Sequence, residues 1–486
     1  MKNERNGLDF LKVTIKGGTM KHVVIVGSGP SGAVAAVTLL EAGWKVTILD
    51  IGSLQNKIND PAITEQNVLA LVKKFDNQNF PYDIDQHLLL SGPSKNWYTS
   101  KTNGGFSLVW GATWRPVEDL GDELWNSARS KVEELMDGYI SGPELNEGNR
   151  KHSCSCFDGI LERFKFADHK MKNNLKVDLS TMAVNSAKCN FSGMCHHKCG
   201  SDAIWTSLNF LKICEENPNF NYVPNTFIQE VIQIDQKVRF NTKNGSFESD
   251  FGLLAAGPVG NAAILLKSNF CEEILLKDTH MLTVPFLSLR RKEKHKGKFG
   301  LAGLVVDGEV SNLKFHLQLY GHPETFEGRI LEALPKLLKP IWKFLFKIIQ
   351  ARLFIGILYL DSTVSGLIKL RLGEQIEHDY VKNKNYSTGL KTIKGKVTNL
   401  FFGLQVYPLW GAAKSAGIGD SYHVGSATGV ELDEFGRLRN STRIGVLGSF
   451  ALPNIDPGPI TYLSMTQAVR LAQHLASSQS QNLETI

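Results

Sequence analysis

The chain of 486 residues has no apolar run long enough to cross a membrane. Its longest uninterrupted runs, such as LFIGILYL at 353–360, fall far short of the roughly 20 residues that a membrane-spanning helix needs. The stretch 1–22 also lacks the long apolar core and the small-residue cleavage site of a secretory signal. We therefore predict neither a membrane span nor a signal peptide, with Met1 or Met20 as the start.

Excess charge and paired cysteines are lacking as well. The net charge of +6 is modest and spread along the chain, and no tract interleaves basic and aromatic residues, which argues against a nucleic-acid partner. Seven cysteines make an odd count for a disulfide framework and fit a reduced, cytoplasmic setting. Without internal repeats, a chain of this length predicts about two or three domains.

What the chain does have is a glycine motif in residues 23–50, VVIVGSGPSGAVAAVTLLEAGWKVTILD. An apolar run, a glycine turn, a small-residue helix and a second apolar run follow one another, as in a dinucleotide-binding unit. Gly27 allows the tight turn, Gly29 lets the backbone approach a pyrophosphate, and Gly32 lets the helix pack closely on the strand. The unpaired amides at the start of that helix then face the phosphates.

An acidic residue ends the second apolar run of this unit. Asp50 lies about 20 residues beyond the glycines, where a carboxylate accepts hydrogen bonds from a ribose diol. No second unit of this kind exists in the chain to bind a separate nicotinamide. This favours a flavin, whose electrons would pass to oxygen, a quinone or a protein.

Three further stretches carry glycine and other small residues. GGFSLVWGA at 104–112 is suited to close backbone approach to a flat ligand, and FGLLAAGPVGNAAILLKS at 251–268 is a strand that leads into a small-residue helix. YHVGSATGVELDEFGRL at 422–438 precedes LPNIDPGPITYLSMTQAVRLAQHL at 452–475. In their order and separations, these stretches and the opening motif resemble the glucose-methanol-choline (GMC) family of FAD-dependent oxidoreductases, with this chain as a divergent member that has a cysteine-rich segment.

The resemblance implies FAD as the cofactor and an α/β fold. That fold has a discontinuous Rossmann-like FAD-binding domain and a second, α+β substrate domain built on a mixed or antiparallel sheet. The implied boundaries are 20–118, 185–268 and 410–486 for the FAD domain, and 119–184 and 269–409 for the substrate or cap domain. The implied FAD contacts are Gly27, Gly29, Pro30, Ser31, Gly32, Asp50, Gly104, Gly105, Ser107, Trp110, Gly111, Ala112, Val231, Ala256, Gly257, Gly448, Pro459 and Thr461.

The resemblance also places a catalytic base at His423, beside the flavin. Histidine suits this role because its pKa lies near neutrality, so the rate of flavin reduction should rise with pH as the imidazole loses its proton. The family usually has a second histidine or asparagine where this chain has Pro457 and Gly458, and an acid where it has Gly448. Asp456 could fill in for the second side chain, although an ionised carboxylate only accepts hydrogen bonds.

The favoured function is oxidation of a CH–OH group of a lipid-like or glycan-linked alcohol by hydride transfer to FAD, as an alcohol dehydrogenase or oxidase. The alternatives are a flavin-dependent C–C dehydrogenase or electron carrier, which the missing partner of His423 would suit, and a non-catalytic flavin-stabilised membrane or assembly protein.

The segment CNFSGMCHHKCG at 189–200 carries clustered cysteines. Cys189, Cys195 and Cys199 have the spacing of a ferredoxin run, but Ser192 replaces its second cysteine. Zinc is an alternative because two histidines lie inside the cluster. We predict no bound metal and a structural loop. The residues that could add ligands are His196, His197, Cys154 and Cys156.

An amphipathic insert lies near 333–352. Its lysines recur every three or four residues beside Leu, Ile, Phe and Trp, and Pro340 starts or kinks the helix. Such a helix either lies on the cytoplasmic face of an anionic membrane or covers the substrate domain. After it, residues 358–372 predict a hairpin with its turn near Ser365 and Gly366. The lysines are Lys336, Lys339, Lys343 and Lys347.

Overall fold

The computed structural model describes most of the chain, with gaps. It describes residues 20–52, 90–91, 100–117, 121–141, 157–167, 173–191, 193, 195, 199, 201–291, 299–321, 344–346, 348–417, 419 and 421–483. None of the helices in these ranges combines the length and the apolarity that crossing a bilayer requires. The four lysines of the amphipathic insert and Pro340 lie outside the described residues.

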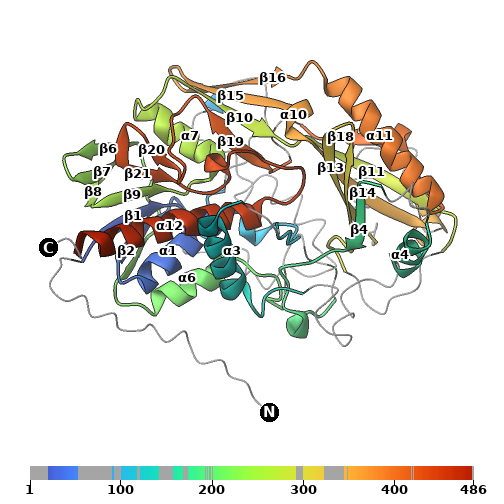
Figure 1. Cartoon of the computed structure of the whole chain (residues 1–486), viewed down its shortest axis with the longest axis horizontal. Coiled ribbons are helices and arrows are strands. Elements are labelled where there is room, and N and C mark those ends of the chain that lie inside the picture. Colours follow the sequence, from blue (N-terminus) through green and yellow to red (C-terminus); the bar gives the residue numbers. More distant parts are fainter. Residues whose placement is uncertain are drawn as a thin grey trace, which may run out of the picture.

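The glycine motif forms the centre of a six-stranded sheet (Figure 1). Its strands, in spatial order, are β20 (Arg437–Leu438), β21 (Ser441–Val446), β9 (Phe251–Leu254), β1 (His22–Val26), β2 (Lys45–Leu49) and β5 (Phe220–Val223). All neighbours pair in parallel except the edge strand β20, which runs antiparallel to β21.

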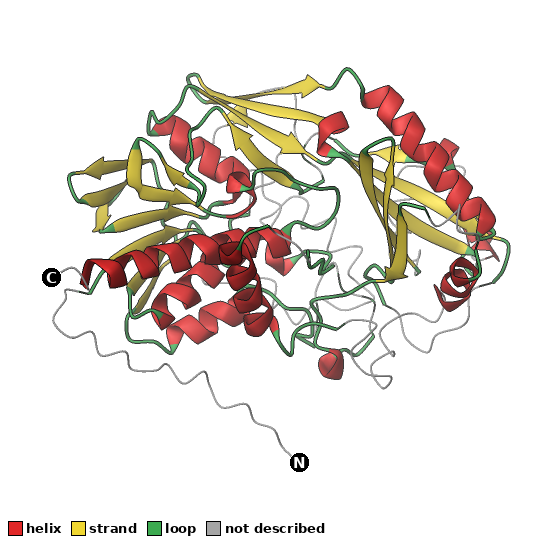
Figure 2. Ribbon diagram, viewed as in Figure 1, coloured by secondary structure: helices red, strands yellow, loops and turns green. Residues whose placement is uncertain are grey.

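Both faces of this sheet are covered, which explains the unbroken apolar sequence of β1. Val23 and Ile25 belong to an apolar cluster on one face, whereas Val24 and Val26 point to the other face and join a second cluster. Figures 1 and 2 show the helices of the first face gathered together. They are α1 (Pro30–Glu41), α3 (Glu123–Met136), α6 (Leu208–Glu215) and α12 (Thr461–Leu483).

The second cluster contains a helix and a small sheet. Helix α7 (Gly257–Lys267) buries Ala262 to Leu266 there. The accompanying three-stranded antiparallel sheet consists of β6 (Glu230–Ile234), β7 (Lys237–Thr242) and β8 (Gly245–Ser249).

A seven-stranded antiparallel sheet occupies the other end of the molecule (Figure 2). Its strands are β17 (Val406–Pro408), β11 (Met281–Ser288), β14 (Leu353–Leu360), β13 (Leu313–Tyr320), β12 (Leu304–Val310) and β4 (Leu175–Leu179), with β18 (Lys414–Ser415) also paired to β11. Helices α4 (Asp158–Lys165) and α11 (Tyr386–Gly403) bury apolar residues against it.

The alternation of side chains along β13 gives this sheet two different faces. Phe315, Leu317 and Leu319 enter the apolar cluster that α11 covers. The residues between them, His316, Gln318 and Tyr320, therefore point to the opposite face. All three are buried as well, so that face is polar but not solvent-exposed.

A five-stranded sheet connects the two ends. Its strands, in spatial order, are β19 (Val424–Thr428), β10 (Glu273–Asp278), β15 (Gly366–Leu372), β16 (Ile376–Lys382) and β3 (Leu90–Ser91).

The predicted hairpin of residues 358–372 is wrong. β14 pairs with β11 and β13, whereas β15 pairs with β10 and β16, so the two strands belong to different sheets. A single helical turn, α10 (Ser362–Ser365), separates them. The side chain of Asp361 caps it by accepting from the Thr363 amide at 2.8 Å, which redirects the chain at the point where a hairpin would need a tight turn.

The predicted fold class is confirmed by the parallel and antiparallel sheets. The predicted domain boundaries stay a prediction. One feature bears on them: α3, which was assigned to the second domain, packs on α12, and Lys131 of α3 pairs with Glu41 of α1 at 3.0 Å.

Candidate active site

The turn after β1 has the backbone that the glycine motif predicts. Gly27 has a φ of +103°, and a Cβ there would lie 2.5 Å from the carbonyl oxygen of Ala255. A Cβ on Gly32 would lie 2.1 Å from the Gly27 oxygen, so α1 could not approach the turn with a larger residue. These two glycines are therefore required by the packing of the protein itself.

Gly29 differs from its neighbours because the space beside it is open. No atom lies within 4 Å of a Cβ built on this residue, although its φ of −62° suits any amino acid. No side chain caps the start of α1, where Pro30 occupies the first turn. Unpaired helix amides beside an open space form an anion-binding arrangement.

The stretches predicted from the resemblance meet at this turn. The Gly104 amide donates to Ser28 Oγ at 2.8 Å, and a Cβ on Gly105 would contact the Gly29 Cα at 3.6 Å. A Cβ on Gly448 would lie 2.8 Å from Ser31 Oγ. Segments hundreds of residues apart thus converge on the start of α1.

The other predicted contacts border this place. Ala256 and Gly257 follow β9, with Gly257 at a φ of +75°, and Pro459 and Thr461 lead into α12. The Ser31 hydroxyl donates to the Ser464 carbonyl of α12 at 3.3 Å, so the N-terminal ends of α1 and α12 meet.

Asp50 lies at the end of β2, as predicted, and its two carboxylate oxygens accept backbone amides. The Ser28 and Gly52 amides each donate to one oxygen at 2.6 Å. Burial raises the pKa of this carboxyl group by more than these hydrogen bonds lower it. Asp50 therefore holds the glycine turn in shape, and its hydrogen bond to a ribose stays a prediction.

Three of the predicted FAD contacts form hydrogen bonds within the protein. The Ser107 hydroxyl donates to the Gly104 carbonyl at 2.6 Å, and the Trp110 indole donates to the Trp205 carbonyl at 2.9 Å. The Val231 amide of β6 donates to Ser268 Oγ at 2.8 Å. These groups shape the surrounding loops and sheet, and their contact with FAD stays a prediction.

Gly111 and Ala112 lie at the border between the two ends of the molecule. A Cβ on Gly111 would lie 3.8 Å from the Tyr320 hydroxyl of β13. Ala112 is fully buried with a φ of +51°, and its carbonyl accepts the Ala183 amide at 2.7 Å. The loop 104–112 thus brings the FAD-binding turn next to the polar face of the seven-stranded sheet.

His423 directly precedes β19, and its ring lies against that same face. The ring packs on Tyr359 of β14, with centroids 4.6 Å apart and planes 30° apart. Its Nδ1 is buried and has no hydrogen-bond partner among the described residues. Burial, with His316 and Arg115 nearby, lowers the pKa of His423 to about 3, so the ring is neutral at neutral pH.

Beside His423, side chains of β12 and β13 form a hydrogen-bonded row. The Tyr320 hydroxyl donates to Gln318 Oε1 at 2.9 Å, and Gln318 Nε2 lies 3.3 Å from His316 Nε2. His316 Nδ1 lies 3.0 Å from Asp307 Oδ1. We call these four side chains the polar row.

The charges of the polar row fix the direction of its hydrogen bonds. Burial by itself would raise the pKa of Asp307, but His316 and the guanidinium of Arg115 outweigh it and hold the pKa at about 2. Asp307 is therefore ionised and only accepts, so His316 Nδ1 must carry the proton and donate. His316 Nε2 is then the acceptor for the Gln318 amide.

His316 fills the space beside Gly458, where the resemblance to the GMC family implies a polar side chain that this chain lacks. A Cβ on Gly458 would lie 2.8 Å from the His316 Cγ, and the φ of Gly458 is +108°. The side chain missing from this loop is thus replaced in space by a histidine that belongs to β13. Asp456, which could have filled in, instead pairs with Lys314 at 3.2 Å.

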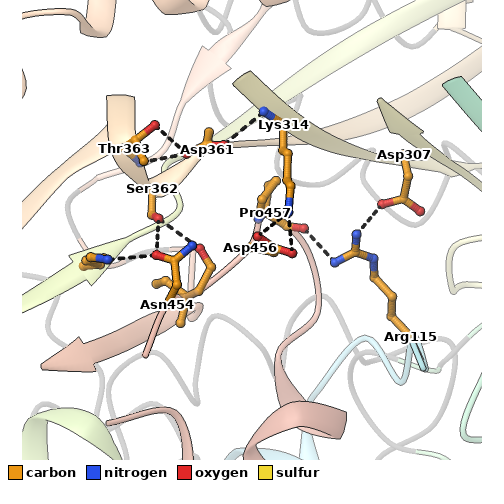
Figure 3. A network of polar contacts seen from close by, with 11 residues as sticks. Arg115, Asp307, Lys314, Asp361, Ser362, Thr363, Asn454, Asp456 and Pro457 are labelled. Atoms are coloured by element: carbon orange, nitrogen blue, oxygen red, sulfur yellow. Dashed lines mark hydrogen bonds and ion pairs between the residues drawn. The ribbon is translucent and has the colours of Figure 1, made fainter. Parts of the chain in front are cut away.

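Figure 3 shows contacts that hold the loop before α12 next to Asp307 of the polar row. Arg115 connects the two: it donates to Pro457 O at 3.3 Å and pairs with Asp307 at 2.8 Å. Ser362 donates to Ile455 O at 2.9 Å. These contacts fix Gly458 against His316.

Arg115 and the four residues of the polar row were not predicted from the sequence. One signal was available: in LKFHLQLY at 313–320, polar and apolar residues alternate, which in a buried strand places the polar ones on a single face. What that face would contact depends on β12, β14 and the loop before α12.

The cysteines of residues 189–199 line one small cavity of about 10 Å³, which is about the space of one water molecule. Phe299 and Leu301 complete its wall. Burial raises the pKa of the Cys189 thiol and raises that of Cys195 to about 11. The raised pKa values indicate that these thiols are protonated at neutral pH while no metal is bound.

Within the described ranges, no group of three potential ligand residues could hold a metal ion. Ser192, His196, His197, Cys154 and Cys156 lie outside them. We expect elemental analysis of anaerobically purified protein to show neither stoichiometric iron nor zinc. One metal centre per chain that is lost in Cys195→Ser would contradict this prediction.

Comparison with families and curated proteins found no match, whereas comparison with solved structures did. A pyridoxine 4-oxidase from Mesorbium loti has a TM-score of 0.57 at 12% identity, over 94% of this chain and 99% of that one. A mutated formate oxidase from Aspergillus oryzae RIB40, studied for FAD modification, has a TM-score of 0.61 at 14% identity, over 96% and 99%. Another formate oxidase structure gives 0.62 at 15%, over 96% and 100%. At these identities, the likeness shows that nearly the whole chain shares their fold.

Proposed function

We propose that this chain is a divergent GMC-type oxidoreductase that binds FAD and oxidises a CH–OH group of a small-molecule alcohol. Two features of the chain support FAD: the open space beside Gly29 at the uncapped start of α1, and the convergence of the loop 104–112 on that turn. Structures that share the fold include oxidases, one of them described with FAD.

The observation that carries the proposed chemistry is the buried, unpartnered Nδ1 of His423. A buried polar atom without a partner is costly, and such atoms are frequently found where a ligand or a reaction supplies the partner. FAD, when bound, would accept a hydride from the substrate carbon. The neutral imidazole of His423 would accept the hydroxyl proton as the hydride leaves.

The polar row supports this chemistry by ordering the surface near His423. Asp307 keeps the His316 ring in one tautomer, and the hydrogen bonds to Gln318 and Tyr320 order the face on which His423 packs through Tyr359. An ordered polar face suits a substrate rich in hydroxyl groups. Of the lipid-like and glycan-linked alcohols predicted from the sequence, it favours the glycan-linked one.

The same geometry weakens the rival function, a C–C dehydrogenase or electron carrier. That function was predicted because Gly458 leaves His423 without a second polar side chain from its loop. His316 now occupies this position in space. The electron acceptor, which is oxygen, a quinone or a protein, stays part of the proposal.

The test is anaerobic reduction of the bound flavin by a panel of polyols, sugars and sterols, without nicotinamide. We expect bleaching of the flavin absorbance by at least one hydroxylated compound of the panel. A double bond in the product would support the C–C dehydrogenase instead. Flavin that no member of the panel reduces would favour the non-catalytic role.

The pH dependence of this reaction follows from the lowered pKa of His423. A base with a pKa of about 3 loses its proton far below neutrality. The rise in rate that an ordinary histidine would cause near pH 6.5 therefore moves to a pH below the range in which the rate is measured. We predict a rate constant of flavin reduction that is flat between about pH 5 and 8, measured by stopped-flow spectroscopy. A rise with an apparent pKa near 6.5 that disappears in His423→Ala would contradict the lowered pKa.

A further inference from the structure

Large apolar side chains are exposed in three segments that hydrogen bonds connect: directly after β11, near the end of α11, and in the helical residues before β14. We call these five residues the apolar tip. They are Leu289 (53% exposed), Phe344 (67%), Leu345 (43%), Ile348 (58%) and Phe402 (62%).

Hydrogen bonds hold the three segments of the apolar tip together. The Leu289 amide donates to the Gln405 carbonyl at 3.1 Å, directly after α11, and the Arg352 guanidinium donates to the Leu289 carbonyl at 2.8 Å. Phe346 belongs to the helical residues before β14 and is only 1% exposed, whereas Phe344 and Leu345 before it are exposed. Its buried ring anchors this helical stretch, so Phe344, Leu345 and Ile348 are displayed from a fixed base.

Positive charge surrounds the apolar tip. Arg290 and Arg291 follow Leu289 directly and are exposed. Arg163 of α4 donates to the Leu404 carbonyl at 2.7 Å, next to Gln405. Burial and the charge of Arg290 lower the pKa of the Arg163 guanidinium, and Glu162 opposes this shift.

The sequence on both sides of the apolar tip is basic as well. The chain continues from Arg291 as KEKHKGK, and Lys336, Lys339 and Lys343 precede Phe344. These residues, and Lys347, lie outside the described residues, so only their charge enters the argument.

Exposed apolar side chains next to the exposed Arg290 and Arg291 match the chemistry of an anionic membrane surface. Apolar side chains enter the boundary between headgroups and acyl chains, while the cations pair with phosphate and carboxylate headgroups. A nucleic acid would match the charge but would offer nothing to aliphatic side chains such as Leu289 and Ile348. We propose that the apolar tip docks this protein on anionic lipid membranes.

The position of the apolar tip allows such docking without involving the nucleotide-binding turn. Figure 1 shows the end of α11 and helix α4 at one end of the molecule and the sheet that contains β1 at the other. This proposal does not depend on the proposed oxidoreductase function.

Co-sedimentation of the full chain with phosphatidylcholine vesicles, with and without phosphatidylserine, tests the proposal. We expect the protein to sediment with phosphatidylserine vesicles at low salt, and to be released at high salt because surface charges are then screened. Phe344→Ser/Ile348→Ser and Arg290→Glu/Arg291→Glu should each reduce binding at least about ten-fold.

Matched controls keep the test specific. Leu372→Ser changes an exposed apolar residue of β15, and Lys382→Glu/Lys384→Glu reverses the same number of charges near the end of β16. Both should bind like the wild type. Equal binding of all variants, wild-type binding that phosphatidylserine does not increase, or no wild-type binding would each overturn the proposal. Circular dichroism and flavin content, measured in parallel, report on folding and on the proposed function separately.

Discussion

Replacing His423, which lies beside the polar row, should slow flavin reduction by about 10²- to 10⁴-fold, or roughly 3 to 5 kcal/mol of barrier. His423→Ala removes the only ring nitrogen that we propose as acceptor of the hydroxyl proton. It should leave FAD in place, because we propose that the turn from Gly27 to Gly32 holds the phosphates. Stopped-flow reduction with an active member of the alcohol panel measures the rate, and the absorbance spectrum measures the bound FAD.

A second histidine serves as the control for this variant. His474 of α12 is partly buried and stacks on Phe435 with centroids 3.6 Å apart, so His474→Ala also removes a packed imidazole. It should be reduced within a few-fold of the wild-type rate. If His423→Ala is reduced just as fast, the proton acceptor lies elsewhere and the C–C dehydrogenase gains support.

The second large effect should come from Gly29→Val, which we expect to fold but to retain less than about a tenth of the FAD of the wild type. A Cβ at this position meets no protein atom within 4 Å and the φ of −62° suits valine, so we expect the valine to enter the space proposed for the pyrophosphate. FAD content of the purified protein, relative to protein concentration, is the measurement.

The control for this variant is a glycine with equally open surroundings that lies away from the turn. Gly411 also has nothing within 4 Å of a built Cβ and has no positive φ, so Gly411→Val should keep its FAD. Gly32→Val is unsuitable, because its Cβ would collide with the Gly27 carbonyl and unfolding would explain any loss. A folded Gly29→Val protein with full FAD occupancy would remove the basis for placing the cofactor at this turn.

The parts of the fold that the sequence predicted are those determined by local patterns. The strand, turn and helix of residues 23–50 follow from apolar runs, from Gly27, whose positive φ other residues rarely adopt, and from Gly32, where a Cβ would not fit. The hairpin of residues 358–372 failed for the same reason, because two apolar strands around a glycine look alike whether they pair with each other or with distant strands. Only the partners of β14 and β15, which lie elsewhere in the chain, decide this.

Only part of the candidate site was predictable from the sequence. The nucleotide-binding turn and His423 belong to short stretches whose residue order is itself informative. His316, Asp307 and Arg115 come from three separate segments, and their chemistry arises from contacts at 3.0 Å and 2.8 Å that no local pattern encodes. The gap at Gly458 was visible in the sequence, but the ring that fills it was not.

The central claim is that this chain oxidises an alcohol by passing a hydride to bound FAD, and a single anaerobic turnover tests it most directly. Purified protein is mixed with an excess of each alcohol of the panel in turn, and the reduced flavin and the carbonyl product are both quantified. The proposed function predicts one carbonyl formed for each flavin reduced, with both yields falling together in His423→Ala at short reaction times. Flavin that stays oxidised with every alcohol, or flavin reduction without a carbonyl product, would contradict it.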